Sequence, residues 1–204
     1  MAHLSRNSSA KKIRQTMRKR RRDLSAALQR KHAAAVALSV LTLRKTSLKG
    51  RNVALYQDFD GELATGILIK QLRKQGAKLF VPIIKGNSIS FAPLMLCSEQ
   101  SLNSYNISEP KTLLFRIKPE QIDLVLMPLT SFDARGNRLG MGAGFYDRCF
   151  AFKRRAPARK PVLAGVAHEV QRAGFGVLPR NCWDVPLDIA ISERGLRKSL
   201  NRRR

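Results

Sequence analysis

The sequence predicts an α/β protein: a single domain built on an open, mostly parallel sheet with helices on both faces. Short apolar segments alternate along the chain with segments of helical periodicity, which is the order of strand–helix–strand units. The apolar segments are continuous and do not alternate with polar residues, as expected for strands buried on both faces. With 204 residues, of which 44% are hydrophobic, the chain can fill one core, and nothing in it demands a second domain.

The first half of the chain supplies two helices and then a strand–helix–strand unit. Residues 1–9 are polar and are expected to be loose. Apolar residues at helical spacing then predict an amphipathic helix, interrupted near Ser25, whose side chain suits the N-cap of a second helix through the Ala-rich residues 33–43. The unit that follows has a strand at 53–56, a helix at 63–74 that Gly76 ends, and a strand at 79–81 that Pro82 closes.

The second half supplies the remaining strands and a glycine-rich connection. Residues 85–121 give a weaker pattern, in which 90–94 can form an edge strand and the rest is expected to be loop. A short helix is expected to start near Gly144. The further strands are expected at 122–127, 162–166 and 189–191.

The chain carries a net charge of +25. Positive charge concentrates at 11–22, at 153–160 and at 194–204, which we expect to be a disordered basic tail outside a domain that spans 10–193. Such a surface predicts weak, nonspecific binding to polyanions. Because no aromatic residues are interleaved with the basic runs and no nucleic-acid motif is present, a nucleic-acid- or ribosome-associated binding protein is only the alternative function.

Several features predict a soluble, cytoplasmic protein. Cys97, Cys149 and Cys182 are odd in number and form no CxxC motif, which argues against a disulfide framework or a zinc site. The longest apolar runs are far shorter than the roughly 20 residues that span a bilayer, and the N-terminus has no apolar signal region. We expect a monomer that binds neither a membrane nor a specific nucleic acid.

The most informative segment runs from 127 to 150, where Gly136, Gly140, Gly142 and Gly144 fall within nine residues, directly after a predicted strand. Glycine admits positive φ and lets an anion approach main-chain N–H groups, so the segment predicts a phosphate site. It has neither the Gly-Lys-Ser/Thr of a P-loop nor the glycine spacing of a dinucleotide fingerprint. The side chains beside it that suit a metal-bound nucleoside triphosphate are Arg138, Tyr146, Asp147 and Arg148.

Four segments carry a resemblance to a known family. They are Phe-Asp at 132–133 with Gly-Asn-Arg-Leu-Gly-Met-Gly-Ala-Gly-Phe-Tyr-Asp-Arg at 136–148, Phe-Asp-Gly-Glu-Leu at 59–63, Ser-Glu-Pro-Lys at 108–111, and Asn-Cys-Trp-Asp-Val-Pro-Leu-Asp at 181–188. Together they resemble the 5-formyltetrahydrofolate cyclo-ligases, also called methenyltetrahydrofolate synthetases. The resemblance covers nearly the whole chain and implies the fold of the ribose-5-phosphate isomerase and CoA-transferase-like group.

The resemblance implies an ATP- and Mg²⁺-dependent closure of 5-formyltetrahydrofolate, with or without a polyglutamate tail, to 5,10-methenyltetrahydrofolate, ADP and phosphate. A formamide carbonyl is a poor electrophile and hydroxide a poor leaving group. Transfer of the γ-phosphoryl group to the formyl oxygen gives an iminium phosphate that N10 of the folate can attack. Catalysis then depends on positioning and on charge neutralisation, and no side-chain nucleophile is required.

The resemblance also implies roles for individual residues, of which Arg138 and Glu62 are expected to be catalytic. The positions similar to the family's ATP-binding residues are Lys11, Lys12, Arg14, Arg138, Leu139, Gly140, Met141, Gly142, Ala143, Gly144, Phe145 and Tyr146. Those similar to its folate-binding residues are Gln57, Glu62, Met141, Gly142, Ala143, Gly144 and Phe145. Those similar to its magnesium ligands are Asp147 and Asp184.

Simpler interpretations of these residues stay open. Asp147 can cap its helix, Asp184 can be a turn residue, and Glu62 can lie in a first helical turn without any substrate. His168 is expected to be structural rather than catalytic.

Two further points stay open. The family commonly has a lysine where this chain has Ala10, which leaves undecided whether Lys11 or Lys12 contacts ATP. An ATP-dependent enzyme of the same fold that acts on another small molecule is a further alternative function.

Overall fold

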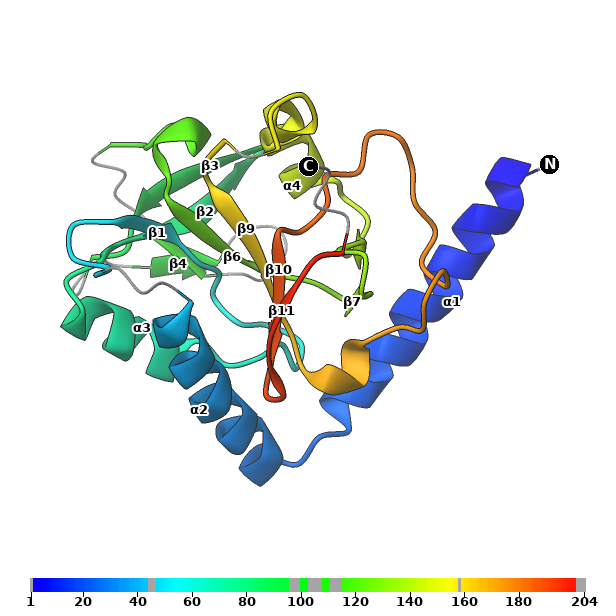
Figure 1. Ribbon diagram of the computed structural model, residues 1–204, viewed down its shortest axis with the longest axis horizontal. Helices are drawn as coiled ribbons and strands as arrows, with labels where there is room; N and C mark the ends of the chain where they lie inside the picture. The colour runs from blue at the N-terminus through cyan, green and yellow to red at the C-terminus, as the bar shows by residue number, and fades with distance from the viewer. Residues whose placement is uncertain are drawn as a thin grey trace.

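The computed structural model describes residues 2–43, 47–95, 100–102, 108–110, 115–157 and 159–200. The strands of its main sheet are β1 (Asn52–Ala54), β2 (Lys78–Lys85), β3 (Ser88–Pro93), β6 (Leu124–Pro128), β9 (Val162–Val166), β10 (Ile189–Ser192) and β11 (Gly195–Lys198). They are arranged in the order β11-β10-β9-β6-β1-β2-β3 (Figure 1). The five central strands run parallel and the two edge strands are antiparallel, which confirms the predicted fold class.

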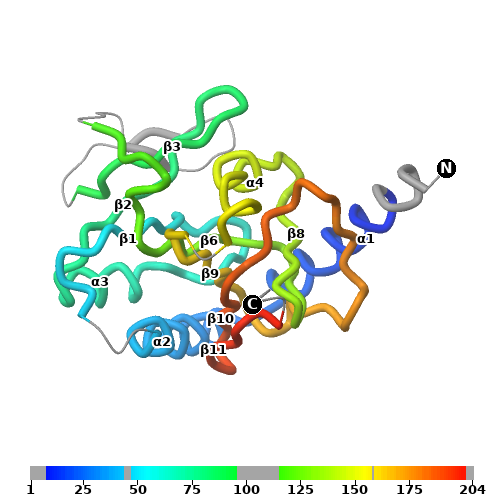
Figure 2. The backbone as a smooth tube through the Cα atoms, turned by 45° about the horizontal axis from the view of Figure 1, so that its top comes forward, coloured from blue at the N-terminus to red at the C-terminus, as the bar shows by residue number. Residues whose placement is uncertain are grey.

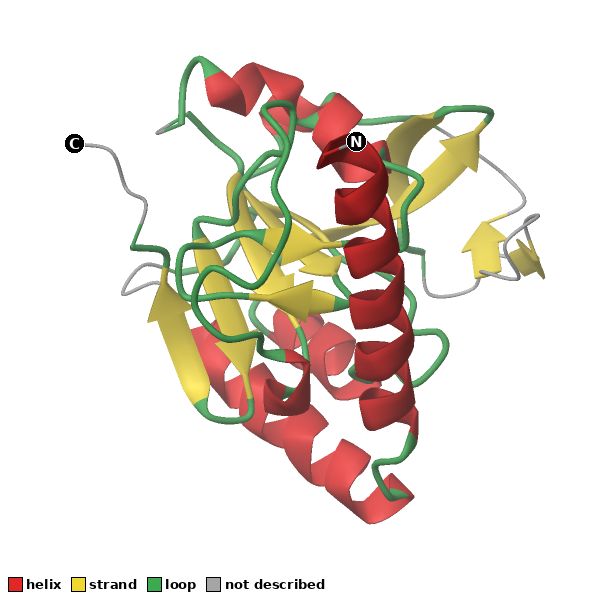
Figure 3. Ribbon diagram, turned by 90° about the vertical axis from the view of Figure 1, so that its right-hand side faces the viewer, coloured by secondary structure: helices red, strands yellow, loops and turns green. Residues whose placement is uncertain are grey.

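Helices cover both faces of this sheet (Figure 3). They are α1 (Ala2–Arg22), α2 (Ala26–Thr42), α3 (Gly66–Lys74) and α4 (Phe145–Cys149), with single 3₁₀ turns η1 (Pro119–Gln121), η2 (Ala151–Arg154) and η3 (Glu169–Gln171). Two small antiparallel sheets pair β4 (Gln100–Leu102) with β5 (Ser108–Pro110) and β7 (Ser131–Phe132) with β8 (Arg138–Leu139). Of the helices that the structure describes, none has both the length and the apolar character needed to cross a membrane.

The core has two layers, one on each face of the sheet. On one face, Val36 of α2 and Leu72 of α3 belong to the cluster that contains Leu126 of β6. On the other face, Phe150 at the end of α4 belongs to the cluster that contains Met127 of β6. All five side chains are fully buried, and each contributes about 1.5–3 kcal/mol by leaving water. Because successive residues of β6 are buried on opposite faces, its sequence is continuously apolar, as predicted.

The predicted strand–helix–strand unit is β1–α3–β2, with Asn52 opposite Lys78 in a parallel register. β1 also pairs in parallel with β6, with Val53 opposite Leu124. The chain therefore leaves β1 and β6 at the same edge of the sheet. The loop after β1 and the glycine-rich connection after β6 meet there, which is where parallel sheets bind their ligands.

Both ends of the chain are more regular than predicted. Residues 2–9 are helical and not loose, because α1 has no glycine or proline to interrupt it. Residues 195–198 form strand β11 instead of a disordered tail. Gly195, with φ of +97°, makes the tight turn that pairs β11 with β10 in a hairpin.

Three internal boundaries also differ from the prediction. Pro82 lies inside β2, because β1 ends at Ala54 opposite Phe80 and no hydrogen bond to β1 is lost at the proline. Helix α3 begins only at Gly66, because Oδ1 of Asp58 holds Thr65 in the loop by accepting its N–H and its hydroxyl, both at 2.9 Å. The region expected to be loop contains β4 and β5, while Cys97 and Lys111 lie outside the described residues.

Candidate active site

The hairpin β7–β8 carries the chain from β6 to the glycine loop, beside α1 (Figure 2). Asp133 fixes its turn: Oδ1 accepts the N–H groups of Arg135 and Asn137 at 2.9 Å each, and Oδ2 accepts Nδ2 of Asn137 at 2.8 Å. Gly136 has φ of +79°, and a Cβ there would lie 2.6 Å from the carbonyl oxygen of Leu187. Gly136 is therefore buried in the turn and shapes the hairpin, whereas the other three glycines form the loop itself.

Residues 140–144 form an exposed loop that helix α1 approaches from one side. Gly142 and Gly144 have φ of +115° and +67°, which favours glycine at both positions. Nε of Arg14 donates to the carbonyl oxygen of Gly140 at 2.9 Å, and a Cβ at Gly142 would lie 3.8 Å from the guanidinium carbon of Arg14. The side chain of Met141 is half exposed at the tip. The loop thus presents main-chain groups to solvent beside an arginine that is already in place.

Arg138 and two aspartates meet at the other end of this loop. Nη2 of Arg138 donates to Oδ1 of Asp147 at 2.7 Å, and the same oxygen accepts the N–H of Val185 at 2.9 Å. Nε of Arg138 is buried and has no hydrogen-bond partner among the described residues. Burial raises the pKa of Asp184, and the neighbouring Asp147 carboxylate raises it further. The N–H of Asn181, which donates to Asp184, lowers this pKa. A carboxylate whose charge is disfavoured by a second carboxylate beside it is a suitable setting for a cation.

Glu62 lies in the loop after β1, and its side chain is only 12% exposed. Oε2 accepts the N–H of Phe59 at 3.3 Å, and Oε1 lies 3.6 Å from Nη1 of Arg21. Burial raises the pKa of Glu62 to about 7, although Arg21 and the Phe59 N–H oppose the rise. Gln57 is half-buried in the same loop.

Tyr146, in the first turn of α4, connects these groups electrostatically. Burial raises the pKa of its hydroxyl, the Glu62 carboxylate raises it further, and Arg138 lowers it. Its ring stacks on Phe150 with the centroids 6.3 Å apart. The structure therefore brings together Tyr146 and Arg138, which were expected to bind ATP, and Glu62, which was expected to bind folate.

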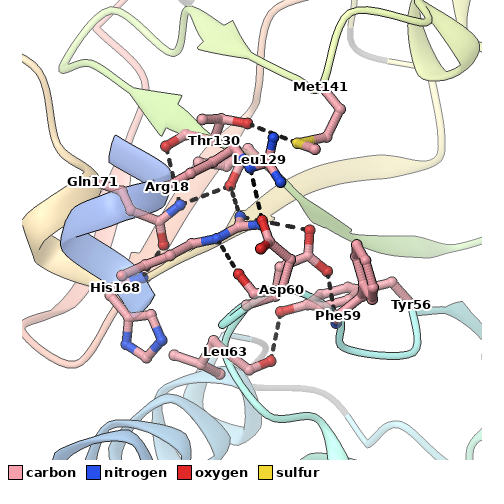
Figure 4. Close-up of polar contacts among 12 residues, drawn as sticks. Arg18, Tyr56, Phe59, Asp60, Leu63, Leu129, Thr130, Met141, His168 and Gln171 are labelled. Atoms are coloured by element: carbon pink, nitrogen blue, oxygen red, sulfur yellow. Dashed lines mark hydrogen bonds and ion pairs between the residues drawn. The ribbon is translucent and has the colours of Figure 1, made fainter. Parts of the chain in front are cut away.

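A buried network around Asp60 holds the loop after β1 (Figure 4). The side chain of Arg21 is fully buried; Nε donates to the carbonyl oxygen of Asp60 at 2.8 Å and Nη2 to Oδ2 of Asp60 at 2.9 Å. Arg18 binds the same carboxylate at 2.7 Å. Asp60 has φ of +53°, a conformation that these contacts stabilise. A weaker contact at 3.4 Å joins Arg21 to the carbonyl oxygen of Leu129, just beyond β6, so the loop after β1 and the loop after β6 are tied together.

The two candidate lysines on α1 differ in direction. Lys11 and Lys12 are both exposed, whereas Ala10 is buried. In an α-helix, residues three and four apart share a face. Lys11 is three residues before Arg14 and lies on the face toward the glycine loop, whereas Lys12, two residues before Arg14, does not.

Known proteins resemble this chain over most of its length. A model of the 5-formyltetrahydrofolate cyclo-ligase family matches residues 6–193. The chain belongs to this family. Among its relatives, the 5-formyltetrahydrofolate cyclo-ligase of Haemophilus influenzae is 33% identical over 184 residues, which cover 88% of this chain and 95% of that protein. The same enzyme of Escherichia coli is 33% identical over 86% of this chain and 96% of its own length.

A solved structure of a family member has the same fold. The solution structure of Aquifex aeolicus 5,10-methenyltetrahydrofolate synthetase superimposes with a TM-score of 0.78 at 28% identity, covering 96% of this chain and 95% of that one. This member of the cyclo-ligase family therefore has both the fold and nearly the full length of its relatives.

The sequence did not single out the Arg21–Asp60 network. Arg21 lies in the basic run at 11–22, yet its side chain is the largest fully buried one described. A signal was present in the resemblance at 59–63, which includes Asp60, a carboxylate that needs a partner when it is buried. Which of the neighbouring arginines supplies that partner depends on how α1 packs.

Proposed function

We propose that this cyclo-ligase family member converts 5-formyltetrahydrofolate to 5,10-methenyltetrahydrofolate with consumption of ATP. One observation carries the proposal: an exposed glycine loop has Arg14 on one side and Arg138 with two aspartates on the other, and the semi-buried Glu62 lies close by. Such a site offers main-chain donors and cations to a triphosphate and a carboxylate to the substrate that receives its terminal group.

ATP binds with its phosphates along residues 140–144. Nε of Arg138 supports this placement, because it is a buried donor without a partner among the described residues, and a phosphate oxygen would satisfy it. Arg14 and Lys11 neutralise charge from the α1 side. The γ-phosphoryl group leaves ADP for the formyl oxygen, N10 attacks the resulting iminium carbon, and phosphate departs with that oxygen.

Asp147 and Asp184 are the residues that would hold a magnesium ion. Their hydrogen bonds use Oδ1 of Asp147 and Oδ2 of Asp184, so the second oxygen of each carboxylate can face a cation. Bound magnesium would neutralise the phosphate oxygens during transfer. The contact of Arg138 with Asp147 positions the guanidinium toward the same phosphates.

Glu62 faces the substrate. As a carboxylate it can accept the N–H groups of the pterin and stabilise the positive iminium that forms during the reaction. Arg21 and Asp60 hold it in place from the side away from the substrate. With a pKa of about 7, Glu62 is only partly ionised at neutral pH in the free protein.

A spectrophotometric assay of methenyltetrahydrofolate formation tests the proposal. Product should form from 5-formyltetrahydrofolate only when ATP and Mg²⁺ are both present, with one ADP released per product. If Glu62→Gln turned over folate as fast as the parent does, this would favour another small molecule as the substrate. RNA binding that persists at high salt, without folate turnover, would favour the nucleic-acid alternative.

A further inference from the structure

A second cluster of chemistry-bearing side chains lies apart from the glycine loop, where α2 meets the ends of β9 and β10. It consists of His32 on α2, His168 just after β9 and Glu193 directly after β10. One ligand atom of each residue lies within 4.8 Å of the other two. In Figure 4, His168 and Met141 of the glycine loop lie on opposite sides of the Asp60 network. The proposed reaction uses none of the three cluster residues.

The two imidazoles face each other with Nδ1 of His32 and Nδ1 of His168 2.9 Å apart. The side chain of His168 is fully buried. One of the two nitrogens carries the proton that the pair shares. A bound ion that takes both nitrogens as ligands would replace this shared proton.

Glu193 supplies a negative charge beside this pair. Its Oε1 lies 3.7 Å from Nε2 of His32. Its Oε2 accepts the N–H of Glu169 at 2.9 Å, a contact that orients the carboxylate without neutralising it. Arg172 and Arg197 pair with Glu169 at 3.4 and 2.8 Å, and among the described residues no ion pair joins either of them to Glu193.

We propose that His32, His168 and Glu193 bind a divalent transition-metal ion, for which Zn²⁺ has the best-matched chemistry. Two imidazoles and one carboxylate form a ligand set for tetrahedral zinc that leaves the fourth position to water. Zinc with Zn–N distances of about 2.05 Å holds two nitrogens ~3.3 Å apart, so the imidazoles need to separate by only ~0.4 Å. Side-chain rotation then brings the Glu193 carboxylate to the ion, which joins α2 to the ends of β9 and β10.

An open cavity of about 500 Å³ borders the cluster at Glu193. Its lining also includes Glu169 and the cations Arg172 and Arg194.

The test is a titration of metal-free, tag-free protein with Co²⁺, followed by visible absorption and then by Zn²⁺ competition. The protein carries Cys182→Ser, because the exposed Cys182 thiol could bind the same ions. We expect one Co²⁺ per chain with the strong visible bands of low-coordinate cobalt, displaced by Zn²⁺. Loss of an outer-shell partner alone weakens metal sites 10–100-fold, so His32→Gln and Glu193→Gln should each weaken binding at least as much.

Two controls keep the result interpretable. Glu193→Gln retains an oxygen for the N–H of Glu169, and Glu120→Gln makes the same chemical change in η1, where binding should be unaffected. Circular dichroism and thermal melts without metal establish that the variants fold, and Zn²⁺ should raise the Tm of the parent but not of His32→Gln. Absence of the cobalt bands, or equal affinity in His32→Gln and the parent, would overturn the proposal.

Discussion

Glu62→Gln is predicted to stabilise the protein while it removes activity. The Glu62 carboxylate is buried beside a single nearby guanidinium, that of Arg21, at 3.6 Å, and burial raises its pKa to about 7 from an ordinary value of 4.5. The folded state therefore binds the proton of Glu62 more tightly than the unfolded state does. A folded-state pKa above the unfolded value means that stability falls as pH rises from 4.5 to 7.

The size of the effect follows from that difference. At 1.36 kcal/mol per pH unit, ionisation of Glu62 costs the folded state ~3 kcal/mol at pH 8 and less than about 1 kcal/mol at pH 5. Glutamine mimics the protonated acid and avoids this cost. The free energy of unfolding of Glu62→Gln should exceed that of the parent by these amounts. In the parent, a buried carboxylate that serves the function lowers the stability of the folded state.

Urea unfolding at pH 5, 6, 7 and 8 measures the difference, and Glu120→Gln serves as the matched control in which no such trend is expected. The folate assay over the same pH range gives the functional half. The kcat/KM of the parent should rise with pH through a pKa near 7, and Glu62→Gln should be nearly inactive throughout. A variant that is destabilised at pH 8, or that retains parental turnover, would refute this account of Glu62.

Three further predictions concern the phosphate side of the site and the hairpin that leads to it. Asp147→Asn keeps an oxygen for the N–H of Val185 but loses the charge. The kcat/KM for MgATP should therefore fall by roughly 100-fold or more, and the variant should need more Mg²⁺. An unchanged Mg²⁺ dependence would contradict the metal assignment. Lys11→Ala should raise the KM for ATP and Lys12→Ala should not; equal effects would show that the helical face was assigned wrongly. Gly136→Ala should lower the free energy of unfolding by at least ~2 kcal/mol, since its Cβ would meet the Leu187 carbonyl. Gly50 has a similar φ of +74°, but an added Cβ there would meet no atom, so Gly50→Ala should lower the free energy of unfolding by about half as much. Denaturant melts compare the two variants.

Local sequence signals were enough to predict the sheet and the elements that flank it. Ser25 caps α2, with its hydroxyl accepting the N–H of Leu28 at 3.3 Å, and Gly76 follows α3 with φ of +74°. These features depend on the conformational preferences of single residues. The strand at 162–166 was located for the same kind of reason, because a strand buried on both faces has a continuously apolar sequence.

The features that the sequence could not supply depend on pairing between distant segments. Strand β11 exists because β10 offers it an edge, and β2 continues past Pro82 because β1 stops short of it. Arg21 is buried because Asp60, 39 residues away, accepts its guanidinium. The meeting of His32 with His168 spans 136 residues. No periodicity within one segment can reveal such contacts.

A crystal structure of the protein with Mg²⁺ and a non-hydrolysable ATP analogue would test the proposed phosphate site most directly. The phosphates should lie against residues 140–144, with Arg138 within hydrogen-bonding distance of a phosphate oxygen and the ion between the phosphates and Asp147. A triphosphate bound elsewhere, with residues 140–144 left untouched, would contradict this placement.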